Sequence, residues 1–507
     1  MTKKRKKVVL VIMDGWGIAP PDKFNAIDNA KTPNFDKLIR EYPNTSLKTD
    51  GESVGLSEGQ FGTSEINHLT IGSGRVIWQE LPKIDKDIET GEFFTNTELL
   101  QTINYVVKNK STLHLMGILS DGGVHSHIRH LFAILEMLEK LSFDYPISLH
   151  IFSDGRDVAP KSISKYMTML EKEIAKRKKL KITISTLQGR VFLDRDRDWD
   201  KTDKAFQLIY KGKGNEIENW ESVINLEYNR NQTDEYFEQY VLDKKYLLSE
   251  NDGLIMTHFR TDRQYQIIKR ILQEDIRNFE ITSFVKASEE FDTLNIAFPR
   301  DDVSGTLAEV ISENGLKQLH VTETEKFPHL TYFLNGQRET ELPKETWKMF
   351  ESNRYVKPKY ALEPTMRNYK IAQEVTNAII HDSFDFIVAN LSSPDMVGHT
   401  GNYHAAVVSA ESVDHCLSKI YEVIKDKLDD YVLMVTADHG NSEIMWDYKN
   451  NQPHTQHTLS KVPFIMVGNM NVELERGVSL IDIAPTILEL LGLEKSPGMT
   501  GDSLIRD

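Results

Sequence analysis

Two apolar segments near opposite ends of the chain each lead into an acidic turn, and this pairing constrains the fold more than any other feature. The segment Val8–Met13 is followed by Asp14, and the segment Tyr431–Thr436 is followed by Asp438 and His439. A short apolar segment bounded by a turn is typical of a buried parallel strand. In open α/β sheets, chemically active side chains gather beyond the carboxyl ends of the strands. We therefore expect one sheet built from both parts of the chain, with a cation bound where these strands end.

Strand-like segments alternate with amphipathic helical segments almost throughout, which predicts an α/β fold with mostly parallel sheets. The length of 507 residues exceeds what a single core usually supports, so two or more domains are expected. If Asp14 and Asp438 meet in space, the strand–helix units between them must form an insertion. The predicted architecture is a discontinuous first domain, residues 1–77 with 311–507, and an inserted second domain, residues 78–310.

The charge balance argues against several classes of partner. Lys and Arg number 61 against 76 Asp and Glu, and the resulting net charge of −15 disfavours nucleic-acid binding, which needs a broad basic face. The single cysteine, Cys416, excludes an intrachain disulfide and a thiolate metal site. The N-terminal KKRKK segment lacks the apolar stretch of a secretory signal, and no segment has the ~20 apolar residues of a membrane span. We expect a cytoplasmic protein with no membrane partner.

Two further segments offer metal ligands. DMVGHTG places Asp395 and His399 four residues apart, so that one helical turn would bring them to the same face, and PHTQHT supplies His454 and His457. A carboxylate combined with an imidazole suits Mn²⁺, Zn²⁺ or Co²⁺. Each segment alone is more typical of a surface pair or a turn. Together with the two acidic strand ends, and without cysteine ligands, they favour a two-metal site.

Ser64 lies in a glycine-rich segment, GQFGTSEINH, directly before a helix predicted to begin at Glu65. Serine before a helix is most often an N-cap. The alternative is a nucleophile at a helix N-terminus, where backbone N–H groups favour a bound phosphate. A serine hydroxyl needs a base or a metal to activate it. Its position in the sequence alone favours the cap.

The middle of the chain carries arginines at successive predicted strand ends. A single arginine is most often a surface ion partner of little energetic weight. Several at strand ends in an acidic protein suggest a clamp for carboxylate and phosphate groups, whose oxygens suit a bidentate guanidinium. His125 and Asp157 lie at the same end of the predicted sheet and could move protons. The arginines are Arg156, Arg190, Arg195, Arg260 and Arg263.

Taken in order, these segments resemble the family of cofactor-independent phosphoglycerate mutases, in the alkaline-phosphatase superfamily. The resemblance runs nearly end to end and rests on MDGWG, GQFGTSEINHLTIGSGR, SDGGVHSH, SDGRD, FRTDR, TETEKFPH, SPDMVGHTG, TADHGN and HTQHT. It implies an alkaline-phosphatase-like domain with an inserted phosphotransferase domain. The implied reaction is interconversion of 3-phosphoglycerate and 2-phosphoglycerate through a phosphoserine, without bisphosphoglycerate.

The resemblance also implies which residues act. It implies two Mn²⁺ ions, with Co²⁺ or Zn²⁺ as alternatives. One would be held by Asp395, His399 and His457, with His454 as the rival to His457, and the other by Asp14, Ser64, Asp438 and His439. Ser64 would accept the phosphoryl group, and Asp157 would move a proton between the two substrate hydroxyls. The implied substrate contacts are His125, Arg156, Asp157, Arg190, Arg195, Arg260, Arg263 and Lys326.

The chain departs from the family pattern in two segments. Family members usually read GNSEVGH where this chain reads GTSEINH, so Thr63 and Asn67 replace Asn and Gly, and the turn beside Ser64 is expected to differ. The family's GRYYAMDRD is one residue shorter here, GRVFLDRD, so the placement of Arg195 rests on the DRD segment.

Two rival functions remain open. One is another metal-dependent phosphoryl enzyme, a phosphatase or a sugar-phosphate mutase, and the other is a non-catalytic metal-binding or scaffolding protein. The arginine set and the length of the insertion favour a phosphoglycerate substrate, and the retained serine and ligands favour an enzyme. We expect a monomer that acts on a small molecule, because one chain carries every implied group.

Overall fold

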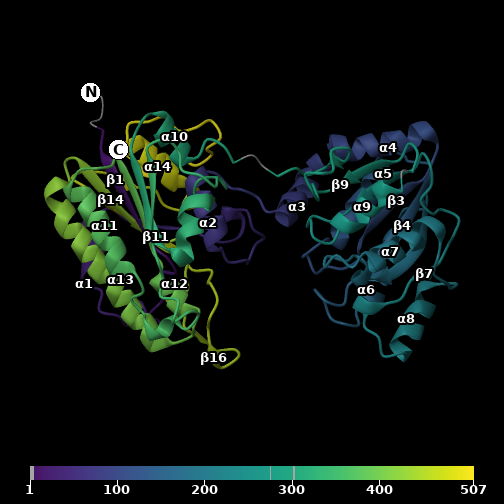
Figure 1. The fold of residues 1–507 in the computed structure, drawn as a ribbon, viewed down its shortest axis with the longest axis horizontal. Helices are drawn as coiled ribbons and strands as arrows, with labels where there is room; N and C mark the ends of the chain where they lie inside the picture. The colour runs from purple at the N-terminus through teal and green to yellow at the C-terminus, as the bar shows by residue number, and fades with distance from the viewer. Residues whose placement is uncertain (1–4, 275, 301–302, 507) are drawn as a thin grey trace. The chain divides into compact units, whose positions relative to one another are not determined.

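The computed structural model describes residues 5–274, 276–300 and 303–506. These residues form two compact units (Figure 1). Unit 1 comprises residues 1–78 together with 301–507, and unit 2 comprises residues 79–300. Each unit has its own sheet and its own buried apolar core.

Unit 1 is built on a seven-stranded sheet. Its central strand, β1 (Lys7–Met13), lies between β13 (Phe386–Leu391) and β14 (Tyr431–Thr436) and runs parallel to both. The two ends of the chain therefore contribute neighbouring strands, as the apolar segments predict. In spatial order the strands are β12 (Glu345–Phe350), β11 (Gln318–Glu323), β13, β1, β14, β17 (Val462–Val467) and β2 (Asn44–Leu47).

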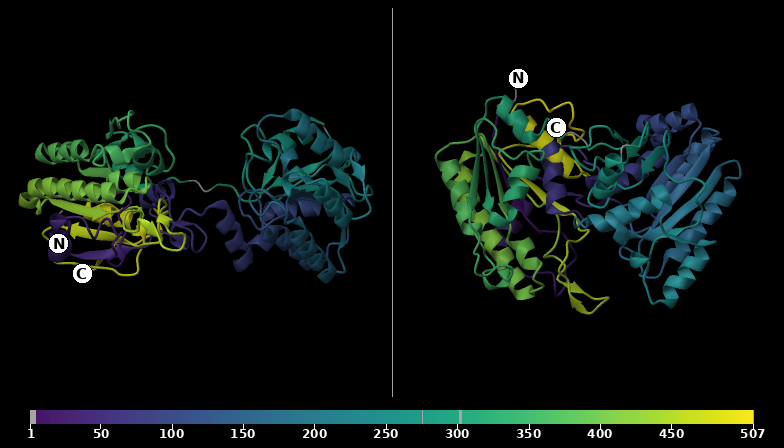
Figure 2. Two further views of the ribbon diagram at one scale, coloured as in Figure 1. Left: turned by 90° about the horizontal axis from the view of Figure 1, so that it is seen from below. Right: turned by 45° about the vertical axis from the view of Figure 1, so that its right-hand side comes forward.

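Helices cover both faces of the unit 1 sheet (Figure 2). Helices α11 (Asn368–Ile380) and α13 (Tyr403–Ile424) pack together on one face, and α2 (Ser64–Ser73) and α14 (Ile483–Leu490) lie on the other. Their apolar side chains and those of the strands form one core. Because both faces of the sheet are buried, its strands are apolar on both sides, which explains the continuous apolar segment Val8–Met13.

Unit 2 also has a sheet with helices on both faces. Buried residues of α4 (Thr97–Asn109), α5 (Ile128–Lys140) and α6 (Ile163–Lys176) line one face, and those of α7 (Trp199–Lys211) and α9 (Tyr265–Gln273) line the other. In spatial order the strands are β10 (Asn295–Ile296), β9 (Glu280–Ser283), β8 (Gly253–Met256), β3 (Leu113–Ile118), β4 (Pro146–Ser153), β5 (Lys181–Gly189), β7 (Tyr240–Val241) and β6 (Asn215–Glu216).

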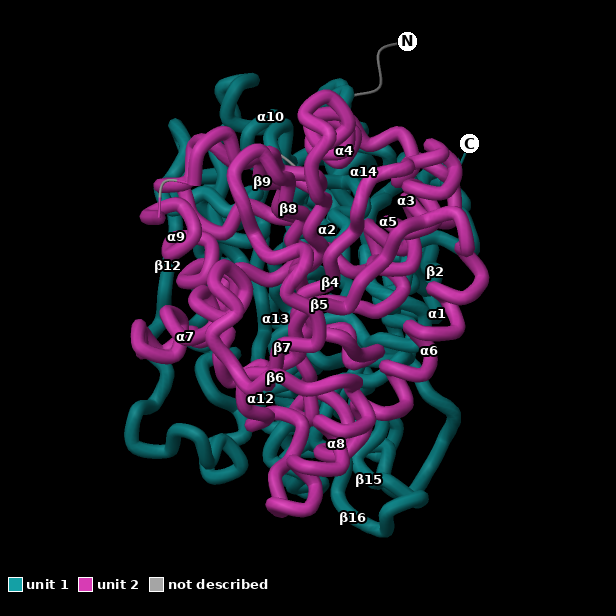
Figure 3. Tube along the Cα trace, turned by 90° about the vertical axis from the view of Figure 1, so that its right-hand side faces the viewer, with its two compact units in different colours: residues 1–78, 301–507 teal, residues 79–300 magenta. Residues whose placement is uncertain are grey.

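The boundaries of the two units differ from the expected ones, chiefly at the second crossover (Figure 3). The chain divides after Trp78 and before residue 301, whereas the expected second boundary lay at residue 310. That position falls inside helix α10 (Leu307–Glu313). Leu307 and Ile311 of this helix are buried in the core of unit 1, so the division has to precede the helix.

The prediction of an α/β fold with mostly parallel sheets is confirmed. Antiparallel pairing joins β14 to β17, β17 to β2 and β5 to β7, near the edges of the two sheets. Among the described residues, none of the helices has both the length and the apolar composition that a bilayer crossing requires.

Candidate metal centre and anion-binding groups

Side chains from several strands meet at the carboxyl edge of the unit 1 sheet. The sheet brings them together because parallel strands all present their carboxyl ends at one edge. Asp14 follows β1, Asp438 and His439 follow β14, Asp395 lies in the short helix α12 (Ser393–Gly398) after β13, and Lys326 ends the 3-10 turn η5 (Thr324–Lys326) after β11. All five side chains are buried, with at most 4% of any residue exposed.

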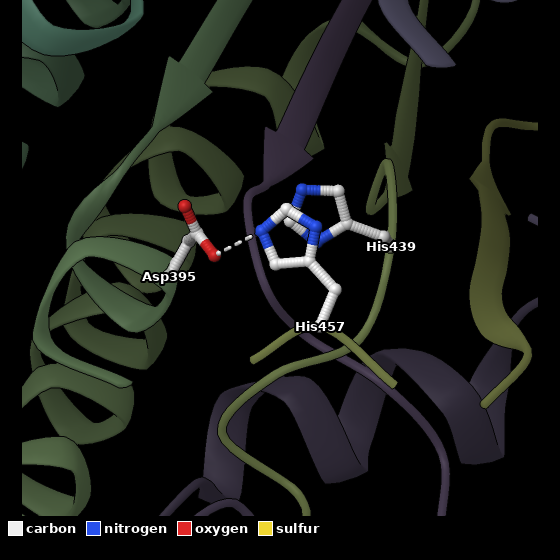
Figure 4. A group of neighbouring side chains, drawn as sticks. All are labelled: Asp395, His439 and His457. Carbon is white, nitrogen blue, oxygen red and sulfur yellow. Dashed lines mark ion pairs between the residues drawn. The ribbon is translucent and has the colours of Figure 1, made fainter. Parts of the chain in front are cut away.

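Asp395 lies between two imidazoles. Its Oδ1 is 3.2 Å from Nε2 of His399 and 3.2 Å from Nε2 of His457, the latter pair drawn in Figure 4. Nδ1 of His399 donates to the carbonyl of Thr455, and Nδ1 of His457 donates to the carbonyl of Gly62, at 2.8 and 2.9 Å. Because a carbonyl only accepts, each ring carries a proton on Nδ1 and turns Nε2 toward the carboxylate, which is the usual arrangement of a metal-binding histidine.

His439 links this group to a second one. Its ring stacks on His457 with centroids 3.6 Å apart (Figure 4), and its Nε2 is 3.3 Å from Asp438 Oδ2 and 3.8 Å from Asp14 Oδ1. One potential ligand atom from each of Asp395, His439 and His457 lies within 4.8 Å of the others, and the same holds for Asp14, Asp438 and His439. Two adjacent groups of three residues thus share His439.

Lys326 reaches into the middle of these residues. Its Nζ lies 2.8 Å from Asp14 Oδ1, 2.8 Å from Asp395 Oδ2 and 2.6 Å from Ser64 Oγ. Burial by itself lowers the pKa of this amine, but the surrounding carboxylates more than offset that effect, so its pKa is raised. The ammonium of Lys326 is therefore a buried cation that contacts one carboxylate from each of the two groups of three residues, and also the serine.

The residues present fit bound divalent cations. The carboxylates of Asp14, Asp395 and Asp438 are buried around one ammonium, and burial lowers the pKa of His439 so that its ring is neutral. Asp438 Oδ2 and His439 Nδ1 also lack a hydrogen-bond partner within the described part of the chain. Carboxylate oxygens and imidazole nitrogens are the donors that Mn²⁺, Co²⁺ and Zn²⁺ accept.

Ser64 is the first residue of helix α2, and its cap is Thr63, whose hydroxyl accepts from the backbone N–H of Ile66 at 3.5 Å. The interpretation of Ser64 as the N-cap is therefore wrong. Its Oγ instead lies 2.8 Å from Nε2 of His439. The helix N-terminus places this hydroxyl beside the acidic groups, in a position that favours bound phosphate.

Asn67, one of the two departures from the family pattern, ties helix α2 to the strand end after β14. Its Nδ2 donates to the carbonyl of Asp438 at 2.7 Å and to the carbonyl of Thr49 at 3.1 Å. The side chain is fully buried. The helix that begins with Ser64 is thus held directly against a residue of the acidic group.

The carboxyl edge of the unit 2 sheet gathers the predicted arginines and acids. Arg190, which follows β5, is buried, and its Nη1 donates to both Asp154 Oδ1 and Asp157 Oδ2. Arg263 is buried as well, and its Nη1 donates to the carbonyls of Arg190 and Leu193 at 3.3 and 2.9 Å. Burial, with Arg190 nearby, lowers the pKa of Arg263 to about 10. Arg190 is thus already paired with carboxylates, whereas Arg263 donates to carbonyls and its Nε lacks a hydrogen-bond partner within the described residues, so Arg263 is the better placed of the two to bind an anion.

Asp262 connects the remaining groups at this edge. Its Oδ1 is 3.2 Å from His125 Nδ1, and its Oδ2 is 3.1 Å from Arg195 Nη1 and 3.5 Å from Arg260 Nε. Burial lowers the pKa of His125 to about 4, so this imidazole is neutral near pH 7.

Arg156 is directed elsewhere within unit 2. Its Nη1 forms an ion pair with Glu235 Oε1 at 3.0 Å, and half of its side chain is exposed. Its backbone nevertheless lies in the turn that holds Asp154, whose Oδ1 accepts from the Arg156 N–H at 3.2 Å. The guanidinium of Arg156 is thus held by Glu235 in a partly exposed ion pair.

Several residues that orient the candidate ligands were missed from the sequence. Asn390 Nδ2 donates to Asp14 Oδ2 at 2.8 Å, and Asn441 Nδ2 donates to Asp395 Oδ1 at 2.8 Å. An available signal was the polar residue at position 390 inside the apolar segment FIVANL, because a buried polar side chain needs a partner. Neither His454, the rival to His457, nor the predicted ligand His399 belongs to a ligand group among the described residues. His399 Nε2 nevertheless lies 3.2 Å from Asp395 Oδ1.

Comparison with known proteins gives consistent matches. A family model for the Metalloenzyme superfamily matches residues 6–495. A 2,3-bisphosphoglycerate-independent phosphoglycerate mutase from Clostridium acetobutylicum is 40% identical over 517 residues, which cover 99% of this chain and 99% of that protein. A protein of the same name from Symbiobacterium thermophilum is 38% identical and covers 100% of this chain and 99% of its own. A phosphoglycerate mutase from Leishmania mexicana, crystallised at low cobalt concentration, has 28% identity and a TM-score of 0.56 over 99% of this chain and 98% of that one.

Proposed function

The chain belongs to the family of 2,3-bisphosphoglycerate-independent phosphoglycerate mutases, and we propose that it interconverts 3-phosphoglycerate and 2-phosphoglycerate through a phosphoserine at Ser64. One observation carries the proposal. Ser64 Oγ lies 2.8 Å from His439 Nε2 and 2.6 Å from Lys326 Nζ, at the meeting point of two acidic groups. A capping or merely structural serine needs no such surroundings, whereas a nucleophile does.

The chain is a member of a metalloenzyme superfamily and binds divalent metal. We propose two Mn²⁺ ions. When bound, such ions supply positive charge that lowers the pKa of the serine hydroxyl and neutralises the phosphoryl oxygens. The proposed ligands are Asp395, His399 and His457 for one ion, with His399 Nε2 3.2 Å from Asp395 Oδ1, and Asp14, Ser64, Asp438 and His439 for the other, with Ser64 Oγ 2.8 Å from His439 Nε2. His439 lies in both groups of three ligand residues, so it is close enough to serve either ion.

The reaction consists of two phosphoryl transfers at one serine. In the first, the bond from Ser64 Oγ to phosphorus forms as the bond from phosphorus to the substrate oxygen breaks, so the hydroxyl proton of Ser64 is lost and the released glycerate oxygen gains a proton. The second transfer is the reverse process at the other glycerate hydroxyl. Lys326 Nζ already lies 2.6 Å from Ser64 Oγ, so it can stabilise negative charge on the serine oxygen and on the phosphoryl group during both transfers.

The glycerate must be held while it exchanges one hydroxyl for the other. We propose that Arg190, Arg195, Arg260 and Arg263 bind the carboxylate and phosphate, because guanidinium groups match both in a bidentate manner. Arg156 joins them by leaving Glu235. Asp157, anchored by Arg190, carries a proton between the two hydroxyls, and the neutral ring of His125, whose Nε2 is 4.0 Å from Asp157 Oδ2, assists it. Water has to be excluded in this interval, or the phosphoserine is hydrolysed.

One assay tests the proposed function. Purified protein is incubated with 3-phosphoglycerate in the absence of bisphosphoglycerate, with chelator alone or with Mn²⁺ restored, and both 2-phosphoglycerate and free phosphate are measured. We expect 2-phosphoglycerate only when Mn²⁺ is present, with little free phosphate. Release of phosphate without 2-phosphoglycerate would instead identify a phosphatase, and no turnover with any metal would favour a non-catalytic role.

We further propose a cytoplasmic monomer. All proposed ligands, the nucleophile and the arginines come from a single chain, so no second copy is needed to supply a residue. The only cysteine, Cys416, is a free and fully buried thiol, which is compatible with a reducing compartment.

A further inference from the structure

Glu443 is a buried carboxylate that belongs to neither ligand group. Its Oε2 accepts from the backbone N–H of Gly17 at 3.2 Å and from the backbone N–H of Asn441 at 2.8 Å. Its Oε1 accepts from the hydroxyl of Thr458. Hydrogen bonds to an ionised carboxylate are roughly twice as strong as those between neutral groups. Through these hydrogen bonds, Glu443 links three separate segments of the chain.

Each of those segments carries a proposed metal ligand. Gly17 belongs to the loop that begins with Asp14, Asn441 belongs to the turn that contains Asp438 and His439, and Thr458 directly follows His457. The backbone joins the same segments around the carboxylate. Asn441 N–H donates to Gly15 O, and Thr458 N–H donates to Gly440 O, both at 3.1 Å.

The chain is closely fitted around this carboxylate. A Cβ placed on Gly17 would lie 2.3 Å from Glu443 Cδ, and a Cβ on Gly440 would lie 2.4 Å from Glu443 Oε1. Both separations are far shorter than two non-bonded heavy atoms tolerate. Glycine at both positions lets the loops approach the carboxylate closely enough to be held by it.

We propose that Glu443 is a positioning residue that sets the geometry, and hence the affinity, of the metal site by holding the loops of Asp14, His439 and His457 in one arrangement. The inference rests on the proposed metal site and adds a residue that does not itself bind metal. Residues behind the ligands typically change metal affinity by 10- to 100-fold when they are removed. The expected effect of losing Glu443 is therefore weaker metal binding by a protein that still folds.

The test measures Mn²⁺ binding directly. Metal-free wild type, Glu443→Ala and Glu443→Gln are titrated with Mn²⁺ by calorimetry, and their melting temperatures are recorded without metal. We expect Glu443→Ala to bind Mn²⁺ about 10- to 100-fold more weakly. Glu443→Gln is expected to stay within about threefold of wild type, because its amide oxygen can accept from both backbone N–H groups while its amide N–H₂ donates to the Thr458 hydroxyl.

A matched control separates positioning from general stability. Glu345 is another buried glutamate of unit 1, and it accepts from Asn335 Nδ2 and from the backbone N–H of Leu342, both at 2.7 Å. It begins β12, at the amino end of the parallel strands, whereas the proposed ligands lie at their carboxyl ends. Glu345→Ala should lower the melting temperature but leave Mn²⁺ affinity unchanged. If Glu443→Ala does not fold, Thr458→Val removes one of the three hydrogen bonds to Glu443, together with the one that the Thr458 hydroxyl accepts from the Ser460 N–H, with little change of shape. It should weaken Mn²⁺ binding about three- to tenfold.

The possible results are distinct. Wild type that binds Mn²⁺, with Glu443→Ala or Thr458→Val binding equally well, overturns the role of Glu443 alone. A loss of affinity in Glu345→Ala as large as in Glu443→Ala also overturns it, because the effect would then be general destabilisation. Wild type that binds no Mn²⁺ overturns the proposed metal site and this inference together.

Discussion

The ammonium of Lys326 lies 2.6 Å from the hydroxyl oxygen of Ser64, inside unit 1 and at the edge of its parallel sheet. The lysine also contacts Asp14 and Asp395, one residue from each ligand group. A fixed cation at this point stabilises negative charge on the serine oxygen without needing to move first. The resemblance implies a substrate contact for Lys326, and the geometry adds a contact with the nucleophile itself.

Replacing this lysine should reduce turnover strongly. Lys326→Met keeps an unbranched side chain, one atom shorter, but removes the charge, and we expect kcat to fall about 100- to 1000-fold, as when one preorganised donor is lost from an active site. Steady-state kinetics with saturating Mn²⁺ measures this. The control is Lys348→Met, at an exposed lysine on β12 of the same unit. Equal kcat values for the two variants would show that Lys326 does not stabilise charge in the reaction.

Removing the buried arginine of unit 2 should weaken substrate binding. Arg190→Lys cannot reproduce the planar guanidinium, and we expect KM for 3-phosphoglycerate to rise roughly 10- to 100-fold, because a hydrogen bond to a charged group contributes about 1.5–3 kcal/mol. The matched control is Arg230→Lys, where the exposed arginine is paired with Glu227. An unchanged KM in Arg190→Lys would remove this residue from the proposed substrate-binding set.

The substitution Asn67→Gly should destabilise the protein. It removes two buried hydrogen bonds to the carbonyls of Asp438 and Thr49 and introduces glycine into helix α2, which together cost roughly 2–3 kcal/mol. Thermal unfolding measures the loss. Asn67→Ala separates the two causes, because it loses the hydrogen bonds without the backbone freedom of glycine. A melting temperature that does not change in either variant would mean that Asn67 does not hold the helix.

The free energy of unfolding should fall on acidification because of a buried imidazole of unit 2, that of His258. Burial lowers the pKa of His258 from 6.5 to about 3, and neither ring nitrogen has a hydrogen-bond partner among the described residues. Between those values the unfolded chain binds more protons than the folded one, so the free energy of unfolding decreases as pH falls, by at most about 1.4 kcal/mol per pH unit for one group.

The variant His258→Gln removes this titration while the proposed metal ligands stay the same. Melting temperatures of wild type and variant, measured from about pH 7 to about pH 5, should decline less steeply in the variant. Parallel declines in the two proteins would show that His258 does not contribute to the acid sensitivity.

The fold and the core of the candidate site were predictable because their signals are local. Apolar segments that end in Asp14 and Asp438 mark parallel strands, and the carboxyl edge of such a sheet is where their side chains must meet. The position of the N-cap was not predictable, because Thr63 and Ser64 are adjacent and either can cap a helix. The second domain boundary was misplaced because the apolar face of α10 gives no sign of which core it joins.

The residues that orient the ligands could not be predicted from the sequence, for a different reason. Glu443 contacts Gly17, and Asn390 contacts Asp14, across more than three hundred residues of chain, as their separations of 426 and 376 positions show. Such contacts exist only after the strands have assembled. A buried acid in NSE or a polar residue in a strand is visible in the sequence, but its partner is not.

The central claim is that the phosphoryl group is transferred to Ser64 during the reaction, and trapping this phosphoserine is the most direct measurement. Mn²⁺-loaded enzyme is mixed with 3-phosphoglycerate, quenched in acid within a single turnover and digested for mass spectrometry, with Ser64→Ala as the control. We predict a phosphorylated Ser64 peptide that appears before 2-phosphoglycerate and decays as it forms, and neither species with Ser64→Ala. Formation of 2-phosphoglycerate by Ser64→Ala, or by wild type with Ser64 unmodified throughout, would contradict the account.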